Sequence, residues 1–209
     1  MKKPKVEVIQ ETSWSRALNA ARRTIGKSPL EKEPSEDWKK MVLMAEHSPI
    51  KLVEYRISFK DLRQWVGVHL LRHEHTIPMI HSQRVDRRDI NELVEGVMGI
   101  IGEDIKNSPD FNKRDYLFQG EPNDQDFYVN AQTLINISRK RLCACASKET
   151  REAWVLVKEA IAEIDPTMAS FMVANCVYRG RCPEMKPCGY YLTEKHHKEV
   201  ENYWKLIGR

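Results

Sequence analysis

Apolar and polar residues alternate along parts of this chain, which is the pattern of a strand with one buried face. The alternation runs from Lys5 to Gln10 and again from Ile50 to Phe59. Pro78 forces the chain into an extended path, and residues 79–85 behind it predict a further strand. We therefore expect a small sheet.

Much of the remaining sequence has apolar residues three or four positions apart, the spacing of an amphipathic helix. The clearest case is Thr150–Ile164, which has one apolar face and Pro166 as its exit. Further helices are predicted over residues 13–25, 38–45, 61–73, 127–142 and 194–206, with Ser13 and Asp61 as N-caps and Gly26 as a stop. Residues 91–106 fit a helix weakened by glycines, and residues 109–125 fit a polar loop. The sum predicts an α+β fold with more helix than strand.

Length and charge narrow the class of protein. The 209 residues suit one domain, placed at residues 1–175, with a Cys-, Pro- and Gly-containing extension at residues 176–209 that ends in a helix. There is no run of roughly 18 uncharged apolar residues and no apolar signal core, so a cytoplasmic protein without membrane contact is expected. The net charge of +4 is too small to imply nucleic-acid binding, although basic residues cluster at 84–88 and 139–141.

The five cysteines are an odd number in a chain without an export signal, which argues against a disulfide framework. Cys176, Cys182 and Cys188 are each separated by five residues, a spacing unlike that of zinc fingers. Cys143 or Cys145 could complete a set of four thiolates if the tail folds back. We expect free thiols and no metal, with a structural metal site as the alternative.

The stretch from Arg72 to Arg84 has the chemistry of a site that binds an anion. In an extended strand, Ile80, Ser82 and Arg84 share one face. Arg72 and His73 would end the preceding helix, across the bend at Pro78. The hydroxyl and guanidinium groups could then converge on one phosphate or carboxylate. The alternative is a surface strand with ordinary ion pairs.

A second polar group is predicted on the helix that contains Asn130 and Arg141. Eleven residues make almost three turns, so Asn130, Ile137 and Arg141 line up on one face. With Asn136 nearby, this face would suit a polar ligand that carries a phosphate.

In these two segments the chain resembles the flavin-dependent thymidylate synthase family (ThyX). Arg72–His73 match the start of its signature, and the Ser-x-Arg of Ser82–Arg84 matches its end at the family's spacing. The segment Asn130–Arg141 matches the family's Asn-Ala-x-x-Leu run and the arginine eleven residues on. The resemblance covers about residues 6–165 in consistent order. Departures from the signature indicate a divergent, phage-like branch; they fall at Glu74, Ile77, Met79, Ile80 and Gln132.

The resemblance implies a ThyX-like catalytic domain, with a central antiparallel or mixed sheet flanked by helices. It implies an FAD-dependent methyltransferase that converts dUMP to thymidylate with NADPH and methylenetetrahydrofolate. It also implies a homotetramer with FAD and nucleotide bound where subunits meet. The departures leave open a related C5 modification of dUMP or dCMP, such as hydroxymethylation. A non-catalytic nucleotide-binding or scaffold protein, and a nucleic-acid binder, are the alternatives from other classes.

The resemblance also implies roles for individual residues. Ser82, Arg84 and Arg141 would bind the nucleotide substrate, and Ser82 and Arg141 would be the catalytic residues. The flavin contacts would come from four residues: Arg72, His73, Asn130 and Asn136.

Overall fold

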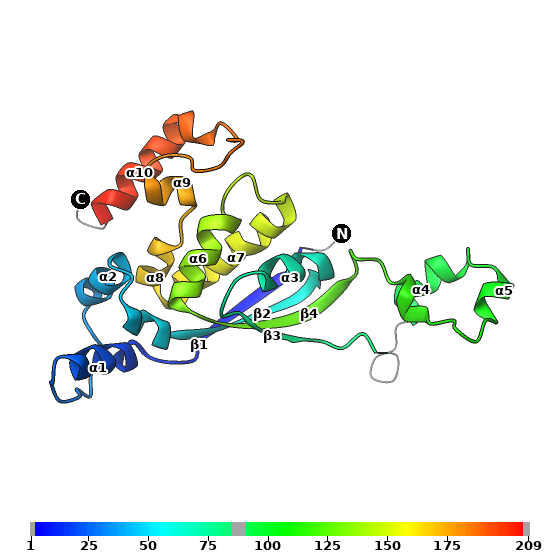
Figure 1. Ribbon diagram of the computed structural model, residues 1–209, viewed down its shortest axis with the longest axis horizontal. Helices are drawn as coiled ribbons and strands as arrows, with labels where there is room; N and C mark the ends of the chain where they lie inside the picture. The colour runs from blue at the N-terminus through cyan, green and yellow to red at the C-terminus, as the bar shows by residue number, and fades with distance from the viewer. Residues whose placement is uncertain (1–2, 85–90, 207–209) are drawn as a thin grey trace.

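Four strands form one antiparallel sheet at the centre of the protein (Figure 1). The computed structural model describes residues 3–84 and 91–206. The strands are β1 (Lys5–Gln10), β2 (Glu54–Arg63), β3 (Ile77–Ile80) and β4 (Pro122–Asn130), in the spatial order β1-β2-β4-β3. The two central strands, β2 and β4, pair from Glu54 opposite Asn130 to Arg63 opposite Pro122. The predicted α+β class is confirmed, and the sheet is antiparallel.

One face of the sheet packs against helices α3 (Gln64–Leu71), α6 (Ala131–Arg141) and α7 (Lys148–Ile164). Burial alternates along β2 and β4, because every second side chain points under these helices. The core between the layers is built from large apolar and aromatic side chains, including Tyr55, Phe59, Phe127, Leu134 and Trp154. Packing against the sheet fixes the positions of α3 and α6, and β3 is the edge strand of that sheet.

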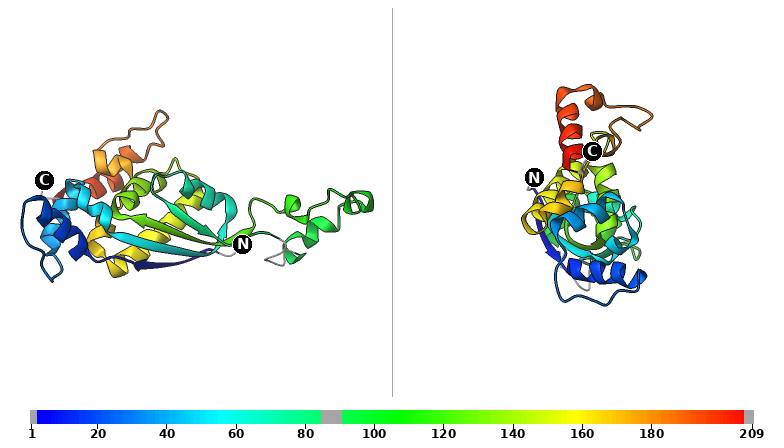
Figure 2. Two further views of the ribbon diagram at one scale, coloured as in Figure 1. Left: turned by 60° about the horizontal axis from the view of Figure 1, so that its bottom comes forward. Right: turned by 90° about the vertical axis from the view of Figure 1, so that its left-hand side faces the viewer.

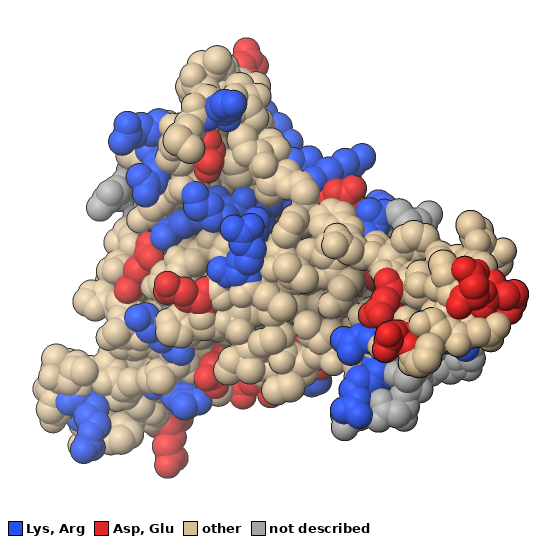
Figure 3. Space-filling view, turned by 45° about the vertical axis from the view of Figure 1, so that its right-hand side comes forward, with Lys and Arg blue, Asp and Glu red and all other residues tan. Residues whose placement is uncertain are grey.

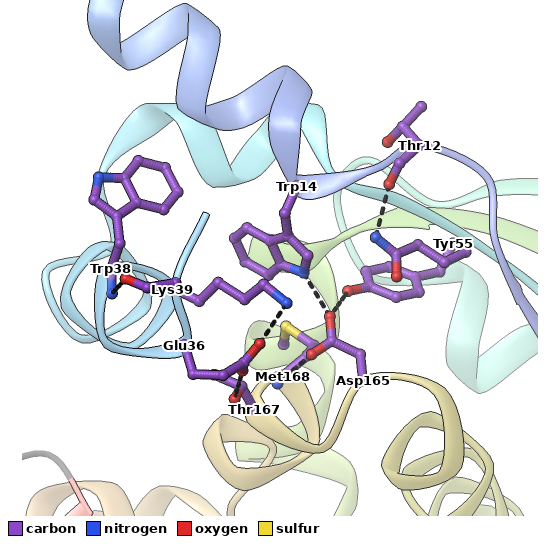
Figure 4. A network of polar contacts seen from close by, with 11 residues as sticks. Thr12, Trp14, Glu36, Trp38, Lys39, Tyr55, Asp165, Thr167 and Met168 are labelled. Carbon is purple, nitrogen blue, oxygen red and sulfur yellow. Dashed lines mark hydrogen bonds and ion pairs between the residues drawn. The ribbon is translucent and has the colours of Figure 1, made fainter. Parts of the chain in front are cut away.

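A buried carboxylate joins the N-terminal segment to the helices (Figure 4). Near it lie α1 (Trp14–Thr24), α2 (Glu36–Met44) and α8 (Pro166–Phe171), and the short 3-10 helix η1 (Ser48–Leu52) packs against α1. Asp165 accepts hydrogen bonds from Trp14 Nε1 at 2.6 Å and Tyr55 Oη at 2.7 Å. Its second oxygen accepts from the backbone nitrogen of Met168 at 3.0 Å and so caps α8. One side chain therefore stabilises contacts between α1, β2 and α8.

Between β3 and β4 the chain leaves the body. The described residues from 91 to 121 form an arm that extends away from the sheet (Figures 1 and 2). It contains α4 (Asn91–Met98), α5 (Glu103–Lys106) and the 3-10 helix η2 (Lys113–Tyr116). The helix predicted over residues 91–106 is therefore interrupted, at the segment that holds two glycines. Ile100 is 86% exposed and Phe118 61%, so the arm presents large apolar side chains to its surroundings.

The C-terminal segment returns to the body on the side of α6. It contains α9 (Asn175–Arg179), the short 3-10 helix η3 (Tyr190–Leu192) and α10 (Glu194–Leu206). Tyr203 of α10 packs edge-to-face on Phe171 of α8, with ring centroids 6.2 Å apart. Among the described helices, none combines the length and the apolar character needed to cross a membrane.

Several predicted elements lie within two residues of their observed ends, namely the strand over 5–10 and the helices over 13–25, 38–45, 150–164 and 194–206. Gly26 adopts the expected left-handed conformation after α1, with φ +70°. Ser13 occupies the N-cap position of that helix, but its side chain makes no capping hydrogen bond.

The predicted boundaries around β2 were wrong. The strand expected at Ile50–Phe59 begins at Glu54, after η1, and continues to Arg63. Asp61 is not a helix cap: it lies within β2 at an irregularity of the pairing with β4, with φ +59°. Its backbone nitrogen donates to Asp124 Oδ1 at 3.1 Å. Pairing with β4 thus extends the strand over residues whose spacing also fits a helix.

Three further predicted boundaries were wrong around the arm. The strand expected at residues 79–85 is instead β3, Ile77–Ile80, and Val85 lies outside the described residues. Pro78 lies within β3, where an edge position tolerates the missing backbone donor. The helix expected at residues 127–142 begins only at Ala131, because the first four residues belong to β4. The polar loop expected over 109–125 accordingly ends before Pro122.

Candidate anion-binding site

His73 and Arg141 are 68 positions apart in the sequence and in direct contact in the fold. Arg141 is the last residue of α6, and His73 lies in the turn between α3 and β3. Nε of Arg141 donates to Nε2 of His73 at 3.0 Å, and Nη2 donates to the backbone oxygen of His69 at 2.6 Å. Because a guanidinium only donates, Nε2 of His73 must be the acceptor. The neutral ring then carries its proton on Nδ1.

Positive charge is concentrated around this pair. Burial together with Arg141, Arg72 and Lys140 lowers the pKa of His73 to about 4. Burial and Arg72 lower the pKa of Arg141 itself. Figure 3 shows Lys and Arg side chains gathered on the body beside the C-terminal segment. At neutral pH the imidazole is therefore uncharged, and the cations around it repel one another.

Such an arrangement is suited to an anion. A phosphate or diphosphate would relieve the repulsion, and a guanidinium can offer it two parallel hydrogen bonds. Nη1 of Arg141 has no hydrogen-bond partner among residues 3–84 and 91–206, so donors remain for a ligand. Three predicted site residues, Arg72, His73 and Arg141, are thus brought together by the fold.

Asn130 and Asn136 each accept a hydrogen bond from a residue of α6. Asn130 is the N-cap of α6, and its Oδ1 accepts from the backbone nitrogen of Thr133 at 2.9 Å. Asn130 directly precedes the first helical residue, and Ile137, between it and Arg141, is buried. Asn136 is exposed, and its Oδ1 accepts from Gln132 Nε2 at 3.3 Å. The expected contacts of Asn130 and Asn136 with a ligand therefore stay predictions, and the buried Ile137 shows that the face between Asn130 and Arg141 is not polar throughout.

Ser82 and Arg84 lie beyond the other end of β3, on the way to the arm (Figure 1). The three steps of an extended chain from Ile77 to Ile80 span about 10 Å, which separates them from the turn that holds His73. The backbone nitrogen of Arg84 donates to Ser82 Oγ at 3.2 Å, so the two residues form a local turn. Ile80, Ser82 and Arg84 do not form the shared strand face that was predicted, because β3 ends at Ile80.

The sequence interpretation missed a network beside α6. Glu46 receives a bidentate contact from Arg139, a hydrogen bond from Gln132 Nε2 at 2.7 Å and one from Tyr178 Oη at 3.3 Å. The Arg139 guanidinium also stacks on the Tyr178 ring, 3.7 Å from its centroid. Burial of Glu46 opposes ionisation, but the hydrogen bonds from Arg139 and Gln132 outweigh it and lower the carboxyl pKa. The basic run at 139–141 was the signal in the sequence, and it does not reveal that Arg139 pairs with a carboxylate while Arg141 donates to an imidazole and a backbone oxygen.

Comparison with solved structures shows what kind of fold carries this site. A crystal structure of the UMP/dUMP methylase PolB from Streptomyces cacaoi, bound with 5-Br dUMP, matches with a TM-score of 0.60. The chain is similar in fold to a pyrimidine nucleotide methylase. The match covers 83% of this chain and 98% of the methylase at 14% sequence identity. No family model and no curated protein matches the sequence.

At this identity the similarity to PolB concerns the fold. It covers nearly the whole of PolB, so the shared architecture is more than a common sheet with one or two helices. The His73–Arg141 contact belongs to this chain's own side chains and does not depend on the comparison. Fold similarity and local chemistry are therefore separate observations.

Proposed function

We propose that this protein is a flavin-dependent enzyme that modifies the C5 position of a pyrimidine nucleoside monophosphate, and that it methylates dUMP. The observation that carries the proposal is the cationic cluster of Arg72, Lys140 and Arg141 around a neutral His73. The PolB-like fold and the ThyX-like spacing of Arg72–His73, Ser82–Arg84 and Asn130–Arg141 support the same class of substrate.

The residues present fit an anionic cofactor or substrate. The cluster offers guanidinium donors to a phosphate, and neutral His73 offers one further N–H from Nδ1. FAD, reduced by NADPH, would supply the hydride, and methylenetetrahydrofolate would supply the one-carbon unit. Arg72 and His73 are assigned to the flavin, and Arg141 to the nucleotide.

Ser82 and Arg84 complete the nucleotide site from another subunit. Within one chain they lie at the opposite end of β3 from His73, so a single chain would leave the two groups apart. The exposed apolar side chains of the arm and of β3 provide surface for subunit contacts; they include Ile77, Met79, Ile100 and Phe118. We propose a homotetramer in which the arms join neighbouring sites.

The experiment is a reaction of the purified full chain with FAD, NADPH and methylenetetrahydrofolate, against each pyrimidine monophosphate in turn. Mass spectrometry of the nucleotide gives the outcome. The mass gain of a methyl group on dUMP supports the proposal. A hydroxymethyl product, or reaction of dCMP, would replace methylation by a related C5 chemistry. If no product forms and the protein stays colourless with excess FAD, the proposed enzyme class is wrong.

Binding experiments test the site separately from the reaction. Arg141→Gln and Arg84→Gln should each weaken dUMP binding about 10–100-fold, since a charge-assisted hydrogen bond contributes about 1.5–3 kcal/mol. Arg23→Gln, at an exposed position of α1, is the matched control and should bind as the unchanged protein does. Unchanged affinity in both test variants would refute the assignment of these residues.

A further inference from the structure

All five cysteines of the chain gather in one place, although they come from two separate segments. Cys143 and Cys145 follow α6, and the other three lie in α9 and in the loop between α9 and α10. Cys143, Cys176, Cys182 and Cys188 line one cavity of about 770 Å³. The Cys145 thiol interacts with the thiols of Cys143 and Cys188. Five thiols from two segments have converged without forming a disulfide.

Backbone N–H groups near the cluster donate hydrogen bonds to two of the cysteine sulfurs. The backbone nitrogen of Cys145 donates to Cys143 Sγ at 3.5 Å, and a backbone N–H, that of Val177, also reaches the sulfur of Cys176. Burial raises the pKa of both thiols, and these backbone hydrogen bonds offset only part of that effect. Gly189, with φ +83°, directly follows Cys188 and allows a tight turn there. Cys145 Sγ lies 3.7 Å from the backbone oxygen of Lys186, so the two loops are in contact.

Core packing accounts for the buried Cys143 and Cys176, but not for the two exposed cysteines beside them. Cys145 and Cys188 are exposed, and Met185 between the loop cysteines is fully exposed. A short loop of this kind buries too little apolar surface to hold itself in place.

We propose that this cysteine cluster binds one Zn²⁺ ion through four thiolates, including those of Cys145 and Cys188. This differs from the free thiols expected from the spacing, and it adopts the alternative in which the tail folds back. Each coordinating thiol loses its proton to solvent, so four protons are released for each ion bound. Tetrahedral coordination by four sulfurs at about 2.3 Å is the usual geometry of a structural zinc site.

Binding requires a small closing movement. Across residues 3–84 and 91–206, no three His, Cys, Asp or Glu side chains already stand ready to hold a metal ion. Cys145 and Cys188 are exposed and lie outside the helices, so we infer that these two sulfurs move inward when the ion binds. The ion would then tie the C-terminal segment to the end of α6, close to Lys140 and Arg141.

The first test is metal content. The full chain is reduced, loaded with Zn²⁺, dialysed and analysed by elemental mass spectrometry, with one zinc per chain expected. Loading should protect four of the five thiols from a thiol reagent and raise the melting temperature, since an ion that binds only the folded state stabilises it. Co²⁺ in place of Zn²⁺ should give the visible spectrum of a tetrahedral thiolate site.

Variants then identify the ligands. The double variant Cys145→Ser/Cys188→Ser should lose the zinc, whereas Met185→Ser, in the same exposed loop, should keep it. Single serine variants of Cys143, Cys176 and Cys182 show which two complete the set, because the third retains metal. The proposal is overturned if the unchanged protein keeps less than about a tenth of an equivalent with no protection of its thiols, or if zinc persists in the double variant. The mass of the starting protein verifies that its thiols are reduced. Protection from the thiol reagent can then be attributed to metal binding and not to disulfide formation.

Discussion

Acid should destabilise this protein in a way that can be traced to His73. The fold lowers the pKa of this histidine from 6.5 to about 4. Between these values the unfolded chain takes up a proton that the folded protein refuses, so the free energy of unfolding falls as pH falls. The contribution of His73 is fully present above pH 6.5 and is lost by about pH 4.

The size of the effect follows from the same two pKa values. At 1.36 kcal/mol for each pKa unit, the difference corresponds to about 3.4 kcal/mol. The ring is only half-buried, so solvent screening reduces this to about 1–2 kcal/mol. Urea unfolding at pH 7 and pH 4 measures the loss, and His73→Gln should reduce the loss by that amount.

Titration of the imidazole by NMR provides an independent check. Arg141→Met should raise the pKa of His73 only part of the way to 6.5, because burial is the largest cause of the shift and Arg141 comes second. Arg23→Met, on α1, is the matched control. Saturating dUMP should also raise the pKa, since a bound phosphate adds negative charge beside the ring. A His73 pKa near 6.5 in the unchanged, ligand-free protein would refute the geometry described for this site.

Three further predictions concern stability and are measured by urea unfolding. Asp165→Ala removes two side-chain hydrogen bonds to a buried carboxylate and the cap of α8, and should cost about 4 kcal/mol; a loss below about 1 kcal/mol would contradict the network in Figure 4. Gly67→Ala places its Cβ 1.8 Å from Oε1 of the buried Gln125 and should lower the free energy of unfolding by about 2 kcal/mol. Gly120→Ala is the control and should change it little, because nothing lies within 4 Å of the added Cβ. Equal effects of the two changes would contradict the close packing of α3 on β4. Glu46→Gln removes the negative partner of Arg139 and should lower the free energy of unfolding by about 1–2 kcal/mol. The control Glu31→Gln, at an exposed position, should cause no measurable loss. An unchanged urea midpoint in Glu46→Gln would mean that the network beside α6 does not contribute to stability.

The spacing of apolar residues within one segment correctly predicted those elements whose residues fit only one type of secondary structure. The helix at Lys148–Ile164 has one long apolar face and a proline exit, so no competing structure fits its residues. Asp61 and Phe127 were assigned to helices because their spacing fits both a helix and a strand. Pairing between β2 and β4, which are far apart in sequence, decided in favour of the strand. A pattern confined to one segment cannot contain that information.

The sequence by itself determined the class of the fold, most of its helices and a set of polar residues suited to an anion. Only the tertiary structure decided which of those residues meet. It placed Arg141 on His73, used Asn130 as a helix cap, paired Arg139 with Glu46 and left Ser82 and Arg84 at the other end of β3. The physical reason is that charge, burial and hydrogen-bond partners depend on distances between segments that are far apart in the sequence, as Trp14 and Asp165 are, 151 positions from each other. Those distances follow from how the sheet and helices pack, and not from local spacing.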